Sequence, residues 1–503
     1  MTQLLRLIFS LALFFSASFA SAAANWYVDS AATGANDGSS WANAWTNLSV
    51  VNWNNLKGGD TLYISGGASG STYGTGTNTI ITHAGSSESD RITIKCGQDA
   101  GHNGRVTISG GFQLGDNSSA MAQFVTIDGR LGTNINMFIV AGAGGWNGIY
   151  HRFASETGNK YLYLDIKAPA GDSQTNGIDL NSLASNTEIA YCNIHDTTQR
   201  AIREGSAGTV TSYGRILIHH NYLGPNVKND GIGIDGGVDV YNNTIDGTGC
   251  DNSLHADGIQ GVTGWWRIYN NIFFNHGQEI FLETVEPSVG HWLIYGNCVY
   301  TNVATANGVT APGIYLRAKD ISGGSGTHGA ITWDNVHICN NTFAYLQLPS
   351  LRISSDSGNT LTLTNSSLDN NIFMGGGVDM AETGENVPTW ASGQFPWRNN
   401  IFSGTPCLKW KSISYASLAA LQSAQSDATG NITTVPTFFN SAAFDFHPTS
   451  GSSGIDSGIT LSFGSPDRDG NARPQGTAWD IGAYEYPSGI VPPSNAVVKI
   501  QPL

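Results

Sequence analysis

One asparagine recurs along this chain in nearly the same setting. It is the second Asn of Tyr241-Asn242-Asn243-Thr244, and strict or looser copies of that string mark Asn193, Asn221, Asn243, Asn271, Asn297, Asn341, Asn371 and Asn400. A period of this size indicates a solenoid, in which each repeat buries its apolar face by stacking on its neighbours. Asn tolerates left-handed backbone and can hydrogen-bond to its counterpart one coil away, so we assign these residues to structure.

The composition fits many short strands joined by tight turns. Glycine provides 63 of 503 residues and charged residues only 12%, yet 40% are hydrophobic, which argues against disorder. The net charge of −15 argues against a nucleic-acid binder. The six cysteines include no CxxC pair, which argues against a zinc site and leaves disulfides and buried thiols as alternatives.

From about residue 145, each repeat reads as two strands that can be overlaid on a central isoleucine. This column contains Ile149, Ile178, Ile202, Ile232, Ile259, Ile280 and Ile314. The residues two places later are His151, Leu180, Glu204, Ile234, Gly261, Leu282 and Leu316, and both columns should point inward because strand side chains alternate. His151 and Glu204 are either satisfied polar core residues or signs of a register error.

The start of the chain contains Asn25-Trp26-Tyr27-Val28-Asp29 and the later turn and strand Gly58-Gly59-Asp60-Thr61-Leu62-Tyr63-Ile64. It resembles the N-terminal cap of secreted pectate-lyase-like proteins. With the Asn repeats and an insertion near residues 321–330, residues 25–430 resemble the right-handed parallel β-helix of the pectin-lyase-like superfamily. We therefore predict an all-β protein with one such helix: N-terminal cap and first coils over 23–90, further coils over 91–430, and a cap at each end.

The last part of the chain carries Ile455-Asp456-Ser457-Gly458, Asp467-Arg468-Asp469-Gly470-Asn471-Ala472-Arg473-Pro474 and Asp480-Ile481-Gly482-Ala483-Tyr484-Glu485. These strings resemble the choice-of-anchor Q domain of bacterial secreted proteins, although Ser452-Ser453-Gly454 replaces that family's usual Ser-Pro-Ala. We interpret 431–486 as a C-terminal cap. The tail 487–503 has no apolar helix or basic run, so we predict no anchoring.

Residues 1–22 have the pattern of a signal peptide. Arg6 precedes a mostly apolar run from Leu7 to Phe19, and cleavage is expected after Ala22 or Ala24. The alternative, a membrane anchor, needs a longer apolar run. We thus expect a secreted extracellular or periplasmic monomer that does not enter a membrane after cleavage.

In the strands that carry the central isoleucine, the residues that point outward form a polar strip. Seven of the 23 basic residues fall on or near it, namely Arg152, Arg200, Arg203, Lys228, Arg317, Lys319 and Arg352. Exposed strand faces are commonly polar, but Ser and Thr would solvate them equally well. The enrichment favours a groove that binds an anionic polysaccharide.

The leading functional hypothesis is β-elimination on a uronate-containing polysaccharide. Its densest motif is His255-Ala256-Asp257-Gly258-Ile259-Gln260. The alternative for Asp257 is a role in capping the turn, because Asn147, Asn176 and Asp230 occupy the same column. The reaction needs a carboxylate neutraliser, a base and an acid. Catalytic candidates are His255, Asp257, Arg317, Lys228 and Tyr315; substrate-binding candidates are Asp179, Arg203, Gln260, Arg152 and Arg352; and possible Ca²⁺ ligands are Asp235, Asp257 and Glu283.

Two other functions stay open. A glycoside hydrolase or epimerase would use paired carboxylates, either Asp230 with Asp257 one coil apart or Asp235 with Glu283 two coils apart. Polygalacturonase-type hydrolases share the fold, but of their motif set only the fragment Asn229-Asp230-Gly231 occurs. A non-catalytic glycan-binding protein would need aromatic platforms, for which Trp146, Trp265, Trp266 and Trp292 are the candidates.

Overall fold

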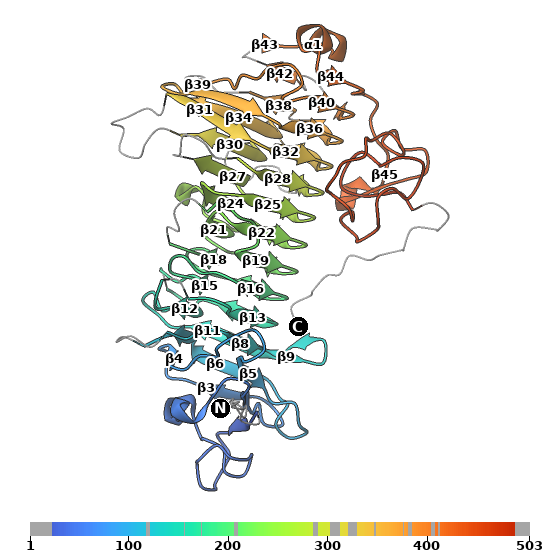
Figure 1. The fold of residues 1–503 in the computed structure, drawn as a ribbon. Coiled ribbons are helices and arrows are strands. Elements are labelled where there is room, and N and C mark those ends of the chain that lie inside the picture. The colour runs from blue at the N-terminus through green and yellow to red at the C-terminus, as the bar shows by residue number, and fades with distance from the viewer. Residues whose placement is uncertain are drawn as a thin grey trace, which may run out of the picture.

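The computed structural model is a long stack of coils with three parallel sheets along its length (Figure 1). It describes residues 23–116, 121–154, 156–172, 174–205, 210–284, 290–301, 312–319, 329–346, 349–375, 377–380, 385–403, 408–410 and 413–487. The signal peptide predicted for 1–22 and nearly all of the tail lie outside the described residues. None of the described helices is long and apolar enough to cross a bilayer.

The first long sheet, sheet A, has fourteen strands that pair in parallel. They are β1 (Asn25–Val28), β2 (Thr61–Ile64), β5 (Ile92–Cys96), β8 (Val125–Asp128), β13 (Lys160–Leu162), β16 (Thr187–Ala190), β19 (Ile216–His219), β22 (Val238–Tyr241), β25 (Trp266–Tyr269), β28 (Trp292–Tyr295), β32 (Val336–Cys339), β36 (Ser367–Asp369), β40 (Trp397–Arg398) and β44 (Ala428–Thr429). Consecutive members come from consecutive coils, which is the arrangement of a parallel solenoid.

Sheet B has twelve strands and follows sheet A around each coil. They are β3 (Ser71–Tyr73), β6 (Val106–Gly110), β11 (Met137–Ala141), β14 (Leu164–Lys167), β17 (Asn193–His195), β20 (Tyr222–Leu223), β23 (Thr244–Asp246), β26 (Ile272–Phe274), β29 (Cys298–Tyr300), β33 (Thr342–Leu346), β37 (Ile372–Gly375) and β41 (Ile401–Ser403). The prediction of two strands per repeat therefore needs correction, because a typical coil contributes a third strand, to the sheet described next.

Sheet C carries the candidate site. Its strands are β4 (Thr79–Ile81), β7 (Phe112–Leu114), β12 (Ile149–His151), β15 (Ile178–Asp179), β18 (Ile202–Arg203), β21 (Ile232–Asp235), β24 (Asp257–Val262), β27 (Gln278–Thr284), β30 (Ile314–Ala318), β34 (Leu351–Asp356), β38 (Val378–Asp379), β42 (Leu408–Trp410) and β43 (Ile413–Ser414), with β39 (Glu385–Asn386) antiparallel on β34. Small sheets pair β9 (Arg130–Leu131) with β10 (Asn134–Ile135), β31 (Ala330–Asp334) with β35 (Thr360–Thr364), and β45 (Phe438–Asn440) with β46 (Asp445–Pro448).

The register of sheet C confirms the predicted overlay. Each isoleucine of the central column is paired with the next one, from Ile149 to Ile314, and all seven are fully buried. The two polar exceptions are core residues with polar neighbours rather than register errors. His151 contacts Tyr161 Oη at 2.5 Å and Glu156 at 3.3 Å, and Glu204 accepts two bonds from Arg215 at 2.6 and 2.7 Å.

The two asparagines of each pair have separate roles. The first is left-handed, with φ between 51° and 57° at Asn242, Asn270, Asn340, Asn370 and Asn399. The second forms a buried ladder in which each Nδ2 donates to the Oδ1 of the next coil at 2.9–3.0 Å, through Asn221, Asn243, Asn271, Asn297, Asn341, Asn371, Asn400 and Asn431. The structural assignment is confirmed for these positions.

Asn193 is not part of this ladder. Cys192 occupies the position instead, and its backbone N–H donates to Asn221 Oδ1 at 2.9 Å. Asn193 lies one residue later and bonds Asp165 at 2.7 Å. The assignment of Asn193 was therefore wrong by one residue, because a Cys-Asn string resembles the Asn-Asn string. Among the described residues, Cys96, Cys192, Cys298 and Cys339 are free and buried, which favours core thiols, and Cys250 is also buried.

The segment 431–486 lies beside the coils rather than over their open end (Figure 1). Helix α1 (Leu418–Ala424) lies at that end, with Leu421 buried in the core. The left-handed asparagines hold the segment: Asn270, Asn340, Asn370 and Asn399 donate to the carbonyl oxygens of Asp467, Asp480, Ile459 and Ser457. The expected position as an end cap therefore needs correction, because the bonding groups of this segment face the turns between sheets A and B.

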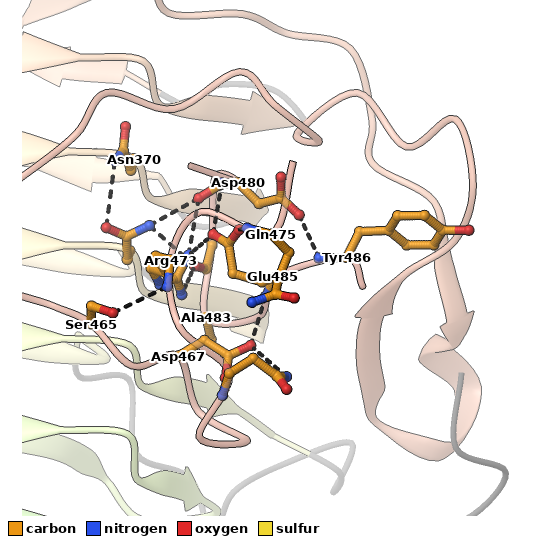
Figure 2. Close-up of polar contacts among 12 residues, drawn as sticks. Asn370, Ser465, Asp467, Arg473, Gln475, Asp480, Ala483, Glu485 and Tyr486 are labelled. Atoms are coloured by element: carbon orange, nitrogen blue, oxygen red, sulfur yellow. Dashed lines mark hydrogen bonds and ion pairs between the residues drawn. The ribbon is translucent and has the colours of Figure 1, made fainter. Parts of the chain in front are cut away.

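A buried ion pair organises that segment internally. Arg473 Nη1 lies 2.7 Å from Glu485 Oε1, and both side chains are fully buried (Figure 2). Asp480 and Gln475 donate backbone N–H groups to the same carboxylate. The strings singled out in the sequence thus converge into one hydrogen-bonded core.

Candidate functional site

The candidate site lies on the outer face of sheet C. Its outward residues are in register along successive strands, and we call this column the polar strip: Tyr150, Asp179, Arg203, Gly233, Gln260, Phe281, Tyr315 and Arg352. Adjacent strands stand about 4.8 Å apart, so neighbouring members of the strip are within reach of one polymer.

His255 and Asp257 form a dyad at the start of β24. His255 Nδ1 lies 3.2 Å from Asp257 Oδ2; 60% of the His255 side chain is exposed but only 2% of Asp257. His255 has a left-handed backbone (φ 58°), and its ring packs edge-on against Phe281 at 5.6 Å. Pairing with Asp257 raises the pKa of His255, and burial raises the pKa of Asp257 to about 7. The exposed imidazole of His255 is therefore paired with the buried carboxyl group of Asp257.

Asp230 supports the dyad from the preceding coil. Its Oδ1 accepts the Asp257 backbone N–H at 3.1 Å, and its Oδ2 accepts Arg200 Nε at 2.6 Å. Asp230 is fully buried, which raises the pKa of its carboxyl group. The Asn147, Asn176 and Asp230 column makes the same coil-to-coil contacts. The residues of this column therefore have the structural role in the turn that was the alternative for Asp257. Asp257 itself also pairs with His255.

Arg200 is the residue whose role sequence reasoning missed. Its guanidinium lies across Gly233, where a Cβ atom would come within 2.4 Å of Arg200 Nε. Arg200 Nη2 also donates to Gln260 Oε1 at 3.2 Å. The sequence signal for this role was Gly233, a glycine among the larger side chains of the outward column.

Arg203 provides a second guanidinium beside Arg200. Its Nη1 contacts both carboxylate oxygens of Asp179, at 2.8 and 3.1 Å, and 38% of its side chain is exposed. Arg152, which directly follows β12 two coils before Arg203, is half-buried with its guanidinium 5.9 Å from the Phe153 ring. The predicted binding candidates Asp179, Arg203 and Gln260 therefore share one surface with His255.

The other catalytic candidates, and the binding candidate Arg352, lie outside the dyad. Tyr315 donates its hydroxyl to Glu385 of β39, and Arg317 Nε donates to Asp356 at 2.7 Å. Arg352 pairs with Asp379 at 3.6 Å. Burial raises the pKa of Tyr315 well above its usual value. Lys228 Nζ donates to the Gly249 carbonyl in a turn. The structure therefore does not bring these residues together with His255 into one cluster.

The three proposed calcium ligands do not meet. Asp235 pairs with Val262, which pairs with Glu283, so these two carboxylates stand two strands apart, about 10 Å. Asp257 lies at the opposite end of β24, and Glu283 is paired with Lys319 at 3.0 Å. Within the described residues, no three His, Cys, Asp or Glu side chains are placed to hold a metal ion. These residues do not fit a Ca²⁺ site, and a calcium requirement stays an untested prediction.

The structure also locates the residues considered for the hydrolase and glycan-binding functions. Asp230 and Asp257 are both buried, so neither carboxyl group of that pair faces the strip. Of the tryptophans, Trp266 and Trp292 are buried packing residues, Trp265 stacks on His291, and Trp146 is exposed.

The sequence matches no protein-family model, and comparison with curated proteins finds no match. The resemblance of 431–486 to choice-of-anchor Q domains therefore stays a prediction. Similar solved structures include pectate lyase Pel9A (15% identity, 92% of this chain and 97% of that chain, TM-score 0.42) and the GH136 lacto-N-biosidase of Eubacterium ramulus (12%, 74% and 67%, 0.43). An alginate lyase from Paenibacillus sp. str. FPU-7 also matches (15%, 70% and 97%, 0.38). Likenesses this distant do not bear on activity, for which the site itself is the basis.

Proposed function

We propose that this protein is a polysaccharide lyase that cleaves a uronate-containing chain by β-elimination. The observation that supports this most directly is the exposed His255, held by the buried Asp257 on the same face as Arg200 and Arg203. A base on the same face as two guanidinium groups is a combination that suits proton abstraction next to a carboxylate.

In the proposed reaction, Arg200 and Arg203 bind the uronate carboxylate and stabilise the charge that develops when C5 loses its proton. Neutral His255 takes that proton on Nε2, while Asp257 stabilises the resulting imidazolium. The electron pair forms the C4–C5 double bond, the C4–O bond breaks, and the leaving oxygen receives a proton from the imidazolium. Each residue in this scheme is a side chain of this protein.

The test is ultraviolet absorbance of unsaturated uronate ends, with the mature protein on alginate, pectate, glucuronan and glycosaminoglycans, each with calcium and with chelator. We expect His255→Ala to lower the initial rate roughly 10²–10⁴-fold. His291→Ala is the matched control, because His291 also has positive φ and a nearby carboxylate, Asp334 at 3.8 Å, but precedes a strand of sheet A. New reducing ends without absorbance would indicate a hydrolase instead, and no reaction on any polymer would favour the glycan-binding alternative.

A further inference from the structure

The polar strip divides into an open part and a covered part. In the open part, the Arg203 side chain is 38% exposed and pairs with Asp179, which is itself only 5% exposed. The Arg200 side chain, which crosses the strip at Gly233, is 26% exposed. In the same column, Phe281 and Tyr315 retain only 5% and 6% exposure, and the Arg352 side chain 9%. The change falls between Gln260 of β24 and Phe281 of β27, which are direct strand neighbours.

The covered part is a block of paired side chains. Strand β39 runs antiparallel to β34 and brings Glu385 onto Tyr315. Arg317 pairs with Asp356, and its guanidinium is 4.0 Å from Glu385. Arg317 keeps 32% exposure because it forms the outer surface of this block. These contacts occupy the face along which a polymer would otherwise continue.

The dyad stands at the boundary between the two parts. His255 packs on Phe281 at 5.6 Å, and Phe281 packs on Tyr315 at 5.2 Å. On the other side, the open part runs over β12, β15, β18, β21 and β24, which is four strand spacings or about 19 Å. A chain bound along the open part therefore meets the block directly after it passes His255.

We infer that the site accepts the end of an anionic polysaccharide chain rather than its middle. This inference rests on the proposed function and adds the mode of attack: the terminal sugars lie against Phe281, and the remainder of the chain extends over Gln260, Arg200 and Arg203. The products would be short unsaturated fragments released from chain ends.

Binding stoichiometry tests this without requiring turnover. His255→Ala protein would be titrated calorimetrically with unbranched oligogalacturonates, oligomannuronates, oligoguluronates, oligoglucuronates and glycosaminoglycan oligosaccharides, some just longer than the open part and some several times longer. An end-binding site gives one protein per chain at both lengths. A stoichiometry that rises in proportion to chain length would overturn the inference and leave the proposed function standing, whereas no binding to any of these oligomers would overturn both.

Two arginines with similar exposure, each paired with a buried aspartate, provide matched variants. Arg203→Ala, in the open part, should weaken binding about 10–100-fold through loss of a charge-assisted contact. Arg398→Ala should leave the affinity within about twofold of the parent, because Arg398 is 39% exposed and pairs with Asp369 at 2.7 Å but belongs to sheet A, outside the polar strip. Thermal unfolding verifies that both variants are folded. Equal loss of affinity in the two variants would mean that the chain does not bind along the open part, and the inference would be wrong.

Discussion

Asn297→Ala tests the asparagine ladder most directly. The Asn297 side chain makes four buried hydrogen bonds: it accepts from the backbone N–H and Nδ2 of Asn271, both at 3.0 Å, and donates to Ile268 O at 2.8 Å and Asn341 Oδ1 at 3.0 Å. Alanine removes all four. Asn271 Nδ2 keeps its bond to Val240 O, and Asn341 Oδ1 keeps the Asn297 backbone N–H.

The magnitude follows from these partners. The Asn271 backbone N–H loses its bond in a buried position, at about 2 kcal/mol, and three further bonds contribute about 1 kcal/mol each. We therefore expect the free energy of unfolding to fall by about 5 kcal/mol, a large fraction of the stability of a typical domain.

Asn193→Ala is the matched control, because its sequence setting suggests the same role. Its Nδ2 bonds only Asp165 in a partly buried position, so we expect a loss of about 1 kcal/mol. Urea unfolding followed by circular dichroism measures both variants against the parent. Losses that agree within about 0.5 kcal/mol would refute the ladder as the source of stability.

Three further outcomes are expected. Asp257→Asn removes the partner that raises the pKa of His255, so the rise of lyase activity with pH should shift to lower pH while the maximal rate falls. A pH profile of activity equal to the parent's would mean that Asp257 does not control the pKa of His255. Burial raises the pKa of Glu156 from 4.5 to about 8, so folding binds a proton and stability falls as pH rises from 4.5 to about 8. Glu156→Gln should therefore add about 3 kcal/mol at pH 7 and flatten that slope in urea unfolding; a slope equal to the parent's would count against it. Asn370→Ala removes contacts to Ile459 and should speed proteolysis within 431–486 without changing unfolding of the coils; an unchanged digestion rate would show that Asn370 does not hold the segment.

The sequence determined the parallel solenoid and much of its register. The isoleucine column from Ile149 to Ile314 was aligned correctly because strand alternation and coil stacking are both periodic. The same periodicity placed Asp179, Arg203 and Gln260 on one outward face, and the local spacing of His255 and Asp257 indicated a pair.

Only the tertiary structure decided which contacts are made by residues that do not follow the repeat. Arg200 crosses Gly233 of the next coil, β39 folds back over Tyr315, and Asn270 binds Asp467 from a segment 197 residues away. These contacts depend on the paths of turns, insertions and the last segment, which carry no repeat. The physical reason is that stacking fixes neighbouring coils through many equivalent bonds, whereas a single long-range contact leaves no pattern in the sequence.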